Sequence, residues 1–143
     1  MSTVREILAA KGGDVIRIDG DATVFDAVKA MVDGNVGAIL VTEGDEIVGI
    51  FTERDYLRRI AVEGRTSRET RVREVMSSPV VIVTPDTTVE EAMAVMSARR
   101  IRHVPVVDGG ELAGVVAIGD LVEFQSRQAS FQLKYLNEYI TAR

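Results

Sequence analysis

The stretch GIFTERDYL (49–57) returns sixty-five positions later as GVVAIGDLV (114–122). The glycine and the aspartate keep their places, whereas the central Thr-Glu-Arg of the first stretch becomes Ala-Ile-Gly in the second. An element that recurs with its ends kept and its polar middle replaced indicates a duplicated unit whose two copies have diverged. The extent of that duplication decides the fold.

The similarity extends well beyond these nine residues. Residues 15–57 align with residues 80–122 without a gap, and most non-identical pairs exchange one apolar residue for another. Upstream, VREIL (4–8) matches VREVM (72–76) at an offset of 68, because the first copy has three extra residues around 11–13. Self-similarity at a fixed offset is typical of tandem structural units. The sequence therefore predicts a first repeat at 1–62, a polar linker at 63–71, a second repeat at 72–125 and a C-terminal helical extension at 126–143.

Each copy has the same predicted order of elements. Apolar, β-branched residues predict a strand at 15–18 and another at 80–83. A capping-box pattern, Thr-x-x-acid, then predicts a helix start at Thr23 and at Thr88. Apolar residues follow both starts at i, i+3, i+4 and i+7, which gives each helix one apolar face.

Two further strands and a second helix complete each copy. The turns Gly44-Asp45 and Asp108-Gly109-Gly110 join the strands, since these residue types tolerate the positive φ of hairpin turns. A second helix is expected from about Asp55 and from about Asp120. The unit is therefore β-α-β-β-α, and the fold class is α/β (α+β).

The two halves are expected to form one module. Each has only about 60 residues, a size at which burial is marginal, so we expect them to pack sheet against sheet with pseudo-two-fold symmetry. From Leu121 onward the chain predicts an extended C-terminal helix, which is rich in aromatic residues: Phe124, Phe131, Tyr135 and Tyr139. This helix either caps the module or pairs with a second subunit.

Composition excludes several classes of function. The 143 residues include no cysteine and one histidine, which argues against disulfides, thiol chemistry and a metal centre. No apolar run approaches the roughly 18 residues that a membrane span needs, and the N-terminus does not have the pattern of a secretory signal. We therefore expect a soluble, cytoplasmic protein without a membrane or metal requirement.

The charge distribution is uneven. The net charge of −5 argues against a nucleic-acid partner, yet residues 54–73 contain seven arginines and three acids. This local surplus could meet an anion smaller than a nucleic acid. On charge alone, a solvated helix end and linker is the better interpretation.

Three motifs together resemble a known family. They are Gly-h-h-Thr-x-x-Asp at 49–55, where h is apolar, RIRHVPVVD at 100–108 and VTPDTTVEEAM at 83–93. The chain resembles the CBS-domain pair, or Bateman module, and its layout is similar to the stand-alone single-pair proteins of bacteria and plant organelles. The resemblance implies a nucleotide-binding cleft between the repeats, dimerisation into a disc, and adenosine ligands such as AMP, ADP, ATP, S-adenosylmethionine or NAD.

Thr52, Arg54 and Asp55 are the first candidate site residues. Thr52 and Arg54 place a hydroxyl and a guanidinium where a strand passes to a helix, which suits a phosphate. Asp55, three residues after Thr52, places a carboxylate that can accept both hydroxyls of a ribose. A plain capping box explains Thr52 and Asp55 equally well. The second copy favours binding, because Asp120 persists although the threonine has become Ala117.

The second set of candidates lies on the strand of the second copy. Arg102 and His103 replace Gly37 and Ala38 of the first copy, and the resemblance implies that residues at these four positions face the cleft. Pro105 gives up a ladder hydrogen bond, which predicts a strand with a free side. By the same resemblance, Thr84 completes the candidate set.

The two copies are expected to bind unequally. The first keeps threonine, arginine and aspartate, whereas the second keeps only Asp120, with Gly119 in place of the arginine. Either one strong and one weak site, or one dinucleotide spanning both, fits this pattern. Arg54 and Arg102, with Arg65 or Arg68, favour a phosphate-bearing ligand, with AMP first and NAD, ADP or ATP as alternatives.

Three functions compete on this reading of the sequence. The first is a non-catalytic sensor, expected as a homodimer, that binds an adenine nucleotide and regulates a partner protein of unknown identity. The second is a ligand-independent, homo-oligomeric scaffold that uses the aromatic C-terminal helix. The third, an enzyme, has little support, since the chain has no phosphate loop, nucleophile elbow or metal-ligand spacing.

Overall fold

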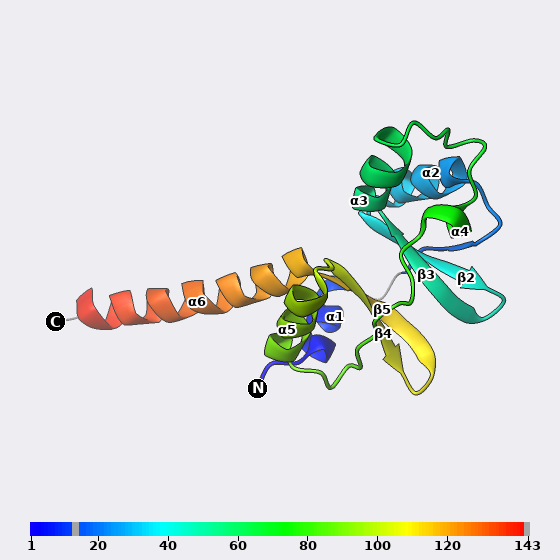
Figure 1. Cartoon of the computed structure of the whole chain (residues 1–143). Coiled ribbons are helices and arrows are strands. Elements are labelled where there is room, and N and C mark those ends of the chain that lie inside the picture. The colour runs from blue at the N-terminus through cyan, green and yellow to red at the C-terminus, as the bar shows by residue number, and fades with distance from the viewer. Residues whose placement is uncertain (13–14, 142–143) are drawn as a thin grey trace. The chain divides into compact units, whose positions relative to one another are not determined.

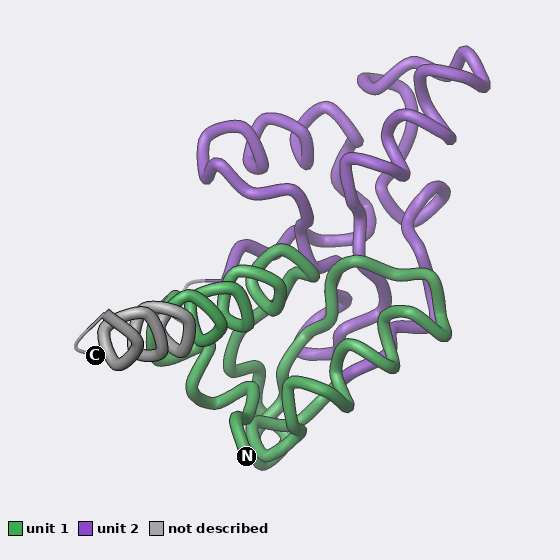
Figure 2. Tube along the Cα trace, turned by 90° about the vertical axis from the view of Figure 1, so that its left-hand side faces the viewer, with its two compact units in different colours: residues 1–13, 83–143 green, residues 14–82 purple. Residues whose placement is uncertain are grey.

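The chain forms two compact units, each described here by itself (Figures 1 and 2). The structure is a computed structural model that describes residues 1–12 and 15–141, with side chains up to residue 130. Unit 2 is continuous, from residue 14 to residue 82, whereas unit 1 combines residues 1–13 with residues 83–143. The compact units therefore have boundaries different from those of the sequence repeats.

Unit 2 is a three-stranded sheet with helices. It contains β1 (Arg17–Asp19), α2 (Val24–Gly34), β2 (Ala38–Glu43), β3 (Glu46–Thr52), α3 (Glu53–Asp55), a π-helix η1 (Tyr56–Ala61) and α4 (Val72–Val75). The strand order is β1-β2-β3, with β1 parallel and β3 antiparallel to β2. Its core joins the apolar face of α2 to the inner residues of β2 and β3 and to α4.

Unit 1 repeats this plan with a smaller sheet. It contains α1 (Val4–Lys11), α5 (Val89–Arg99), β4 (His103–Asp108), β5 (Glu111–Ala117) and α6 (Ile118–Thr141). The bounds of α5, β4 and β5 are each displaced by 65 residues from those of α2, β2 and β3. The predicted mixed α+β fold built from two copies of one unit is therefore confirmed.

The two hairpins confirm the predicted turns. Glu43 pairs with Glu46, and Asp108 pairs with Glu111, so each loop has two residues. Gly109 and Gly110 both have positive φ, at 59° and 84°, which is the requirement of a type I′ turn. Each hairpin also shifts register at equivalent places, after Val41 and after Val106.

The strand predicted at 80–83 is absent, and Pro105 explains why. In unit 2 the N–H of Leu40 donates to the Ile16 carbonyl at 3.2 Å and helps to join β2 to the β1 segment. Pro105 is the counterpart of Leu40 and has no N–H. Only an isolated parallel bridge between Val83 and Val106 remains. The prediction of a strand at 80–83 was wrong. The predicted free side of the strand that carries Pro105 is only partly free, because the Pro105 carbonyl accepts the N–H of Val83 at 3.0 Å and the N–H of Val107 donates to the Val83 carbonyl at 2.9 Å.

Other sequence expectations needed smaller corrections. The first strand occupies Arg17–Asp19 and not 15–18. Thr23 and Thr88 cap their helices by accepting the N–H of Asp26 and Glu91 at 3.1 Å, but within the described residues neither acid returns a bond to the cap. Each is therefore half of a capping box. The helices expected from about Asp55 and Asp120 begin two residues earlier, so each aspartate is a third helical residue.

The short helices α1 and α4 are exchanged between the repeats. Helix α1, from the first repeat, lies in unit 1, and α4, from the second repeat, lies in unit 2. Equivalent bonds fix both: the N–H of Val4 donates to the Thr87 carbonyl, and that of Val72 donates to the Ala22 carbonyl, each at 2.9 Å. Val4 and Val72 are fully buried. Each unit therefore completes its core with a helix from the other repeat.

Several expectations stay predictions. These are the repeat boundaries (1–62, 72–125), the linker (63–71), the extension (126–143) and the packing of the two halves into one pseudo-two-fold module. Helix α6 reaches Thr141. The side chains of Phe131, Tyr135 and Tyr139 lie outside the described residues, and their role in capping or pairing stays a prediction.

Candidate functional site

The first candidate site is the junction of β3 and α3, residues 52–55, here called the first junction. Thr52, at the end of β3, is the cross-strand partner of Ala38 at the start of β2. The N–H of Glu53 donates to the Gly37 carbonyl at 3.0 Å. The structure therefore brings together four predicted site residues of unit 2: Gly37, Ala38, Thr52 and Asp55.

Hydrogen bonds hold Asp55 in place at this junction. Its Oδ2 accepts the N–H of Thr52 at 3.0 Å, and its own N–H donates to Thr52 Oγ1 at 3.1 Å, which makes a complete capping box. Its Oδ1 accepts the hydroxyl of Ser77 at 3.0 Å. Sequence reasoning missed Ser77, because its place beside Asp55 depends on the segment after α4 returning to β3, where the N–H of Ser77 donates to Ile50.

The second candidate site is the junction of β5 and α6, residues 117–120, here called the second junction. Ala117 pairs with His103 across β4 and β5, and the N–H of Ile118 donates to the Arg102 carbonyl at 2.8 Å. This arrangement repeats that of the first junction at the same positions. The backbone of Arg102 and His103 therefore lies next to the helix start that carries Asp120, within unit 1.

Asp120 has a different set of partners from Asp55. Its Oδ2 accepts both the N–H of Ala117 at 2.8 Å and the ammonium of Lys11 at 2.6 Å. Lys11 Nζ also donates to the Val115 carbonyl at 2.7 Å. Nothing in the sequence placed Lys11 here, because the contact depends on the exchange of α1 into unit 1.

The Ala117 bond corrects one inference from the sequence. From the sequence alone, the persistence of Asp120 without a threonine favours ligand binding over capping. In the structure the carboxylate still holds the backbone N–H at the helix start, as Asp55 does with Thr52. Capping alone is therefore a sufficient reason to keep the aspartate, and its persistence does not distinguish the two interpretations.

The remaining predicted residues, Pro105 and Thr84, also belong to unit 1. Pro105 is buried in β4, and its carbonyl accepts the N–H of Val83 at 3.0 Å. Thr84 follows directly and is exposed, with its N–H donating to Thr87 Oγ1 at 3.1 Å. Thr84 therefore shapes the turn before α5, and its hydroxyl lies within 3.4 Å of the Thr87 hydroxyl.

The arginine-rich segment is mostly paired within unit 2. Arg65 lies 2.8 Å from Glu74, and Arg71 and Arg73 both pair with Asp21. The guanidinium of Arg68 lies 3.8 Å from the centre of the Phe25 ring. These contacts hold residues of the segment 63–71 against the rest of unit 2, where Thr70 is buried, and they occupy Arg65 and Arg68, which were candidate phosphate ligands.

Two arginines remain available at the junctions. Arg54 and Arg102 are exposed, and neither forms an ion pair among the residues that the structure describes. Their counterparts in the other copy are Gly119 and Gly37. Each junction therefore has one arginine and one glycine, in exchanged positions.

One carboxyl group of unit 2 has a shifted pKa. The Arg71 N–H and the Arg65 guanidinium both donate to the carboxylate of Glu74, and the bond from the Arg71 backbone contributes most to lowering its pKa below the usual 4.5. Both bonds stabilise the ionised form. The carboxylate of Glu74 therefore joins α4 to residues 65 and 71 through two hydrogen bonds.

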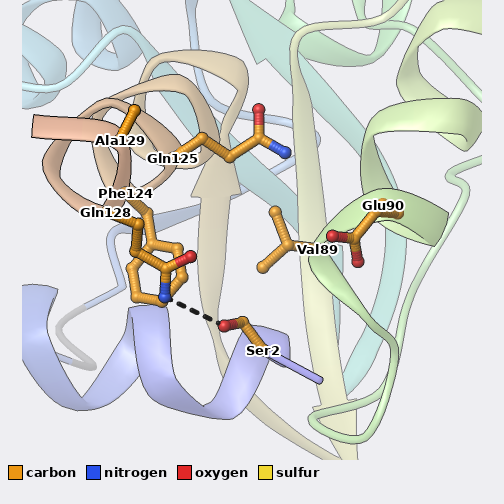
Figure 3. A pocket seen from close by; sticks show the side chains of 7 residues that line it. All are labelled: Ser2, Val89, Glu90, Phe124, Gln125, Gln128 and Ala129. Atoms are coloured by element: carbon orange, nitrogen blue, oxygen red, sulfur yellow. Dashed lines mark hydrogen bonds between the residues drawn. The ribbon is translucent and has the colours of Figure 1, made fainter. Parts of the chain in front are cut away.

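Hollows on the described surface lie near both junctions and near the N-terminus. One of about 470 Å³ lies in unit 2 between α2 and η1, and Gly37 lines it. Another, of about 210 Å³, lies in unit 1 and is lined by Lys11 and Asp120 together with residues of α1 and α6. The third, of about 160 Å³, includes the 3.2 Å bond from Gln128 Nε2 to Ser2 Oγ (Figure 3) and contains no predicted site residue.

The described residues contain no cluster of three or more histidine, cysteine, aspartate or glutamate side chains that could hold a metal ion. A search of the same residues finds no helix that is long and apolar enough to cross a membrane.

Comparison with known proteins identifies the family. The CBS domain model matches residues 4–62 and 72–127, which are the two copies of the repeat. The chain belongs to the CBS-domain family and contains a pair of CBS domains. This family is typically regulatory and binds ligands.

Relatives cover nearly the whole chain. A mitochondrial CBS-domain protein of Arabidopsis thaliana, CBSX3, is 40% identical over 97% of this chain and 72% of its own length. A CBS-domain protein of Burkholderia ambifaria has 44% identity and a TM-score of 0.82, over 85% of this chain and 92% of the solved one. The hexameric CBS-CP12 protein of bloom-forming cyanobacteria has 34% identity and a TM-score of 0.77, over 84% and 70%.

Proposed function

We propose that this protein is a non-catalytic sensor that binds an adenine nucleotide, with AMP the first candidate, and transmits its occupancy to a partner protein in the cytoplasm. The observation that carries the proposal is the acceptor capacity of Asp55. A carboxylate has about four lone-pair positions, two on each oxygen. Each Asp55 oxygen accepts one bond within the protein, so one position on each oxygen is left for the two hydroxyls of a ribose.

Charge at the first junction supports a phosphate on the same ligand. Arg54 is exposed and adjacent to Asp55, and a guanidinium is suited to bidentate contact with phosphate oxygens. Arg102 offers the same chemistry at the second junction. Two arginines that have no acidic partner among the described residues favour AMP, ADP, ATP or NAD over the cationic S-adenosylmethionine.

A thermal-shift panel of these five compounds tests the proposal. A bound ligand at a hundredfold excess over its Kd stabilises the protein by about 2.7 kcal/mol, and we expect this for a phosphate-bearing member of the panel. The shift should be lost in Asp55→Ala and kept in Asp26→Ala, which alters an acid in the first turn of α2. Flat curves for every compound, or a shift that survives Asp55→Ala, would contradict the proposal.

Self-association is the second element of the proposal, and an apolar groove favours it. Val32 and Leu57 line the hollow between α2 and η1 and are 72% and 59% exposed. Large apolar side chains exposed together mark an interaction surface. A hexameric relative shows that assembly occurs among similar CBS proteins. We propose that a second copy of this chain covers the groove and forms a homodimer.

Native mass spectrometry distinguishes a homodimer formed through this groove from a scaffold that assembles through α6. Leu57→Glu should convert the dimer to a monomer, whereas Leu57→Met should not. If the protein is instead a ligand-independent scaffold that assembles through α6, truncation after Gln128 abolishes assembly and substitutions at Asp55 have no effect. A dimer that persists in Leu57→Glu overturns the assignment of the groove.

A further inference from the structure

Lys11 forms a specific contact at the second junction. It is the last residue of α1, and its ammonium bonds to Asp120 Oδ2 at 2.6 Å and to the Val115 carbonyl at 2.7 Å. The corresponding carboxylate of the first junction, that of Asp55, instead accepts the neutral hydroxyl of Ser77. The two repeats therefore satisfy the same carboxylate in chemically different ways.

The count of acceptor positions separates the two aspartates. Asp120 Oδ2 accepts two bonds, one from Ala117 and one from Lys11, and this uses both of its lone pairs. A ribose presents two adjacent hydroxyls, which a carboxylate binds best with one hydroxyl on each oxygen. Asp55 has one position left on each oxygen, whereas Asp120 has positions left on Oδ1 alone.

We propose that Lys11 closes Asp120 to the cis-diol of a ribose and so limits the chain to one ribose-anchored nucleotide. The proposal rests on the function proposed above and adds a residue that sets its stoichiometry. Lys11 acts as an internal competitor, because it holds the lone pair that the second hydroxyl needs. The second copy has therefore lost Thr-Glu-Arg, and its aspartate, Asp120, is bonded to a lysine of the same chain.

Stability alone is a weak reason for the ion pair. The Lys11 side chain is 37% exposed and that of Asp120 is 26% exposed, and pairs open to solvent contribute little, because water and salt screen them. The pair borders the hollow of about 210 Å³ between α1 and α6. Removal of the ammonium group of Lys11 would therefore enlarge an existing hollow and leave the core intact.

The test measures how many AMP molecules each chain binds, by isothermal titration calorimetry and native mass spectrometry. Wild-type protein should bind one. Lys11→Met, which keeps the apolar stem, should bind two, and Lys11→Met with Asp120→Asn should return to one. Lys29→Met is the matched control, because Lys29 also pairs with an acid, Asp33, but on the surface of α2. It should bind one.

A change of ligand tests the diol directly. In Lys11→Met the second equivalent should bind 2′-deoxy-AMP about ten- to a hundredfold more weakly than AMP, as expected for one lost hydrogen bond to a charged group. The inference is overturned if Lys11→Met, folded by circular dichroism, still binds one AMP, or if wild-type protein binds two. If no variant binds AMP, ADP, ATP or NAD, the proposed function fails, and the inference fails with it.

Discussion

Gly114 of β5 lies against Leu8 of α1 so closely that a Cβ at this glycine would be 2.7 Å from Leu8 Cδ2. The counterpart contact joins Gly49 of β3 to Met76, which directly follows α4, and is closer still. The glycine that recurs in both copies is therefore the place where the exchanged helix meets the strand. Its recurrence reflects packing and needs no ligand.

Substitution of this glycine should destabilise the protein. Gly114→Ala adds a methyl group against the end of the half-buried Leu8 side chain, which can rotate away in part, so we expect a cost of about 1 kcal/mol, at the low end for overpacking. Gly119→Ala is the control, since a Cβ there meets nothing within 4 Å and alanine favours the helix. Urea unfolding of both variants checks the prediction. Equal free energies of unfolding in the two variants would show that the Leu8 side chain makes room for the methyl group without destabilising the protein.

Thr52 and Thr23 separate capping from binding. Each accepts the N–H three residues on at 3.1 Å, so Thr52→Ala and Thr23→Ala should each lower the free energy of unfolding by about 1 kcal/mol. Only Thr52→Ala should also weaken AMP binding, because only Thr52 lies at the first junction. Calorimetric titration measures the second effect. Equal affinities in the two variants would indicate that Thr52 is a cap and nothing more.

The stability of unit 2 should depend on pH through Glu74. Its pKa is lowered in the folded protein, so its contribution is complete above the unfolded pKa of about 4.5 and is lost as the pH falls through the folded pKa. Glu74→Gln should therefore be less stable than wild type at pH 7, and the difference should narrow below pH 4.5. Thermal unfolding across this range measures it, with Glu63→Gln as control for lost surface charge. A difference that is constant with pH contradicts the assignment.

The end of α5 offers a stabilising substitution. Arg100 caps this helix with a φ of 55°, a left-handed conformation that favours glycine. Arg100→Gly should raise the free energy of unfolding by about 0.5–1 kcal/mol, whereas Arg99→Gly, within the helix, should lower it by a similar amount. Chemical denaturation of the pair decides this. A loss of stability in Arg100→Gly would mean that its side chain makes a contact worth more than the strain.

The sequence predicted the repeated unit well, because the evidence for it is local. The turn Gly109-Gly110 and the cap Thr88 depend on residues within a few positions, and both are observed. The strand at 80–83 failed because its β-branched residues are locally suitable, whereas the missing donor belongs to Pro105, about twenty residues away. A strand needs both its own propensity and a partner with a free N–H.

The contacts at the two junctions could be predicted only in part, and the role of the candidate residues in binding stays a prediction. The structure brings Thr52 and Asp55 together with Gly37 and Ala38, four residues that the family resemblance had placed at one site. Ser77 and Lys11 could not be predicted, because each reaches its aspartate only through the exchange of helices. The sequence separation is 22 residues for Ser77 and 109 residues for Lys11. No local pattern encodes such a contact.

The exchange of α1 and α4 also fixes the order in which the cores can close during synthesis. Unit 2 has all its core residues once the chain has been made as far as Met76. Helix α1 is made first, but Val4 and Ile7 pack against residues from Val83 onward, which the ribosome delivers on the order of ten seconds later. The core of unit 1 can therefore close only after that of unit 2, and the apolar face of α1 stays uncovered until the chain has been made as far as Leu121.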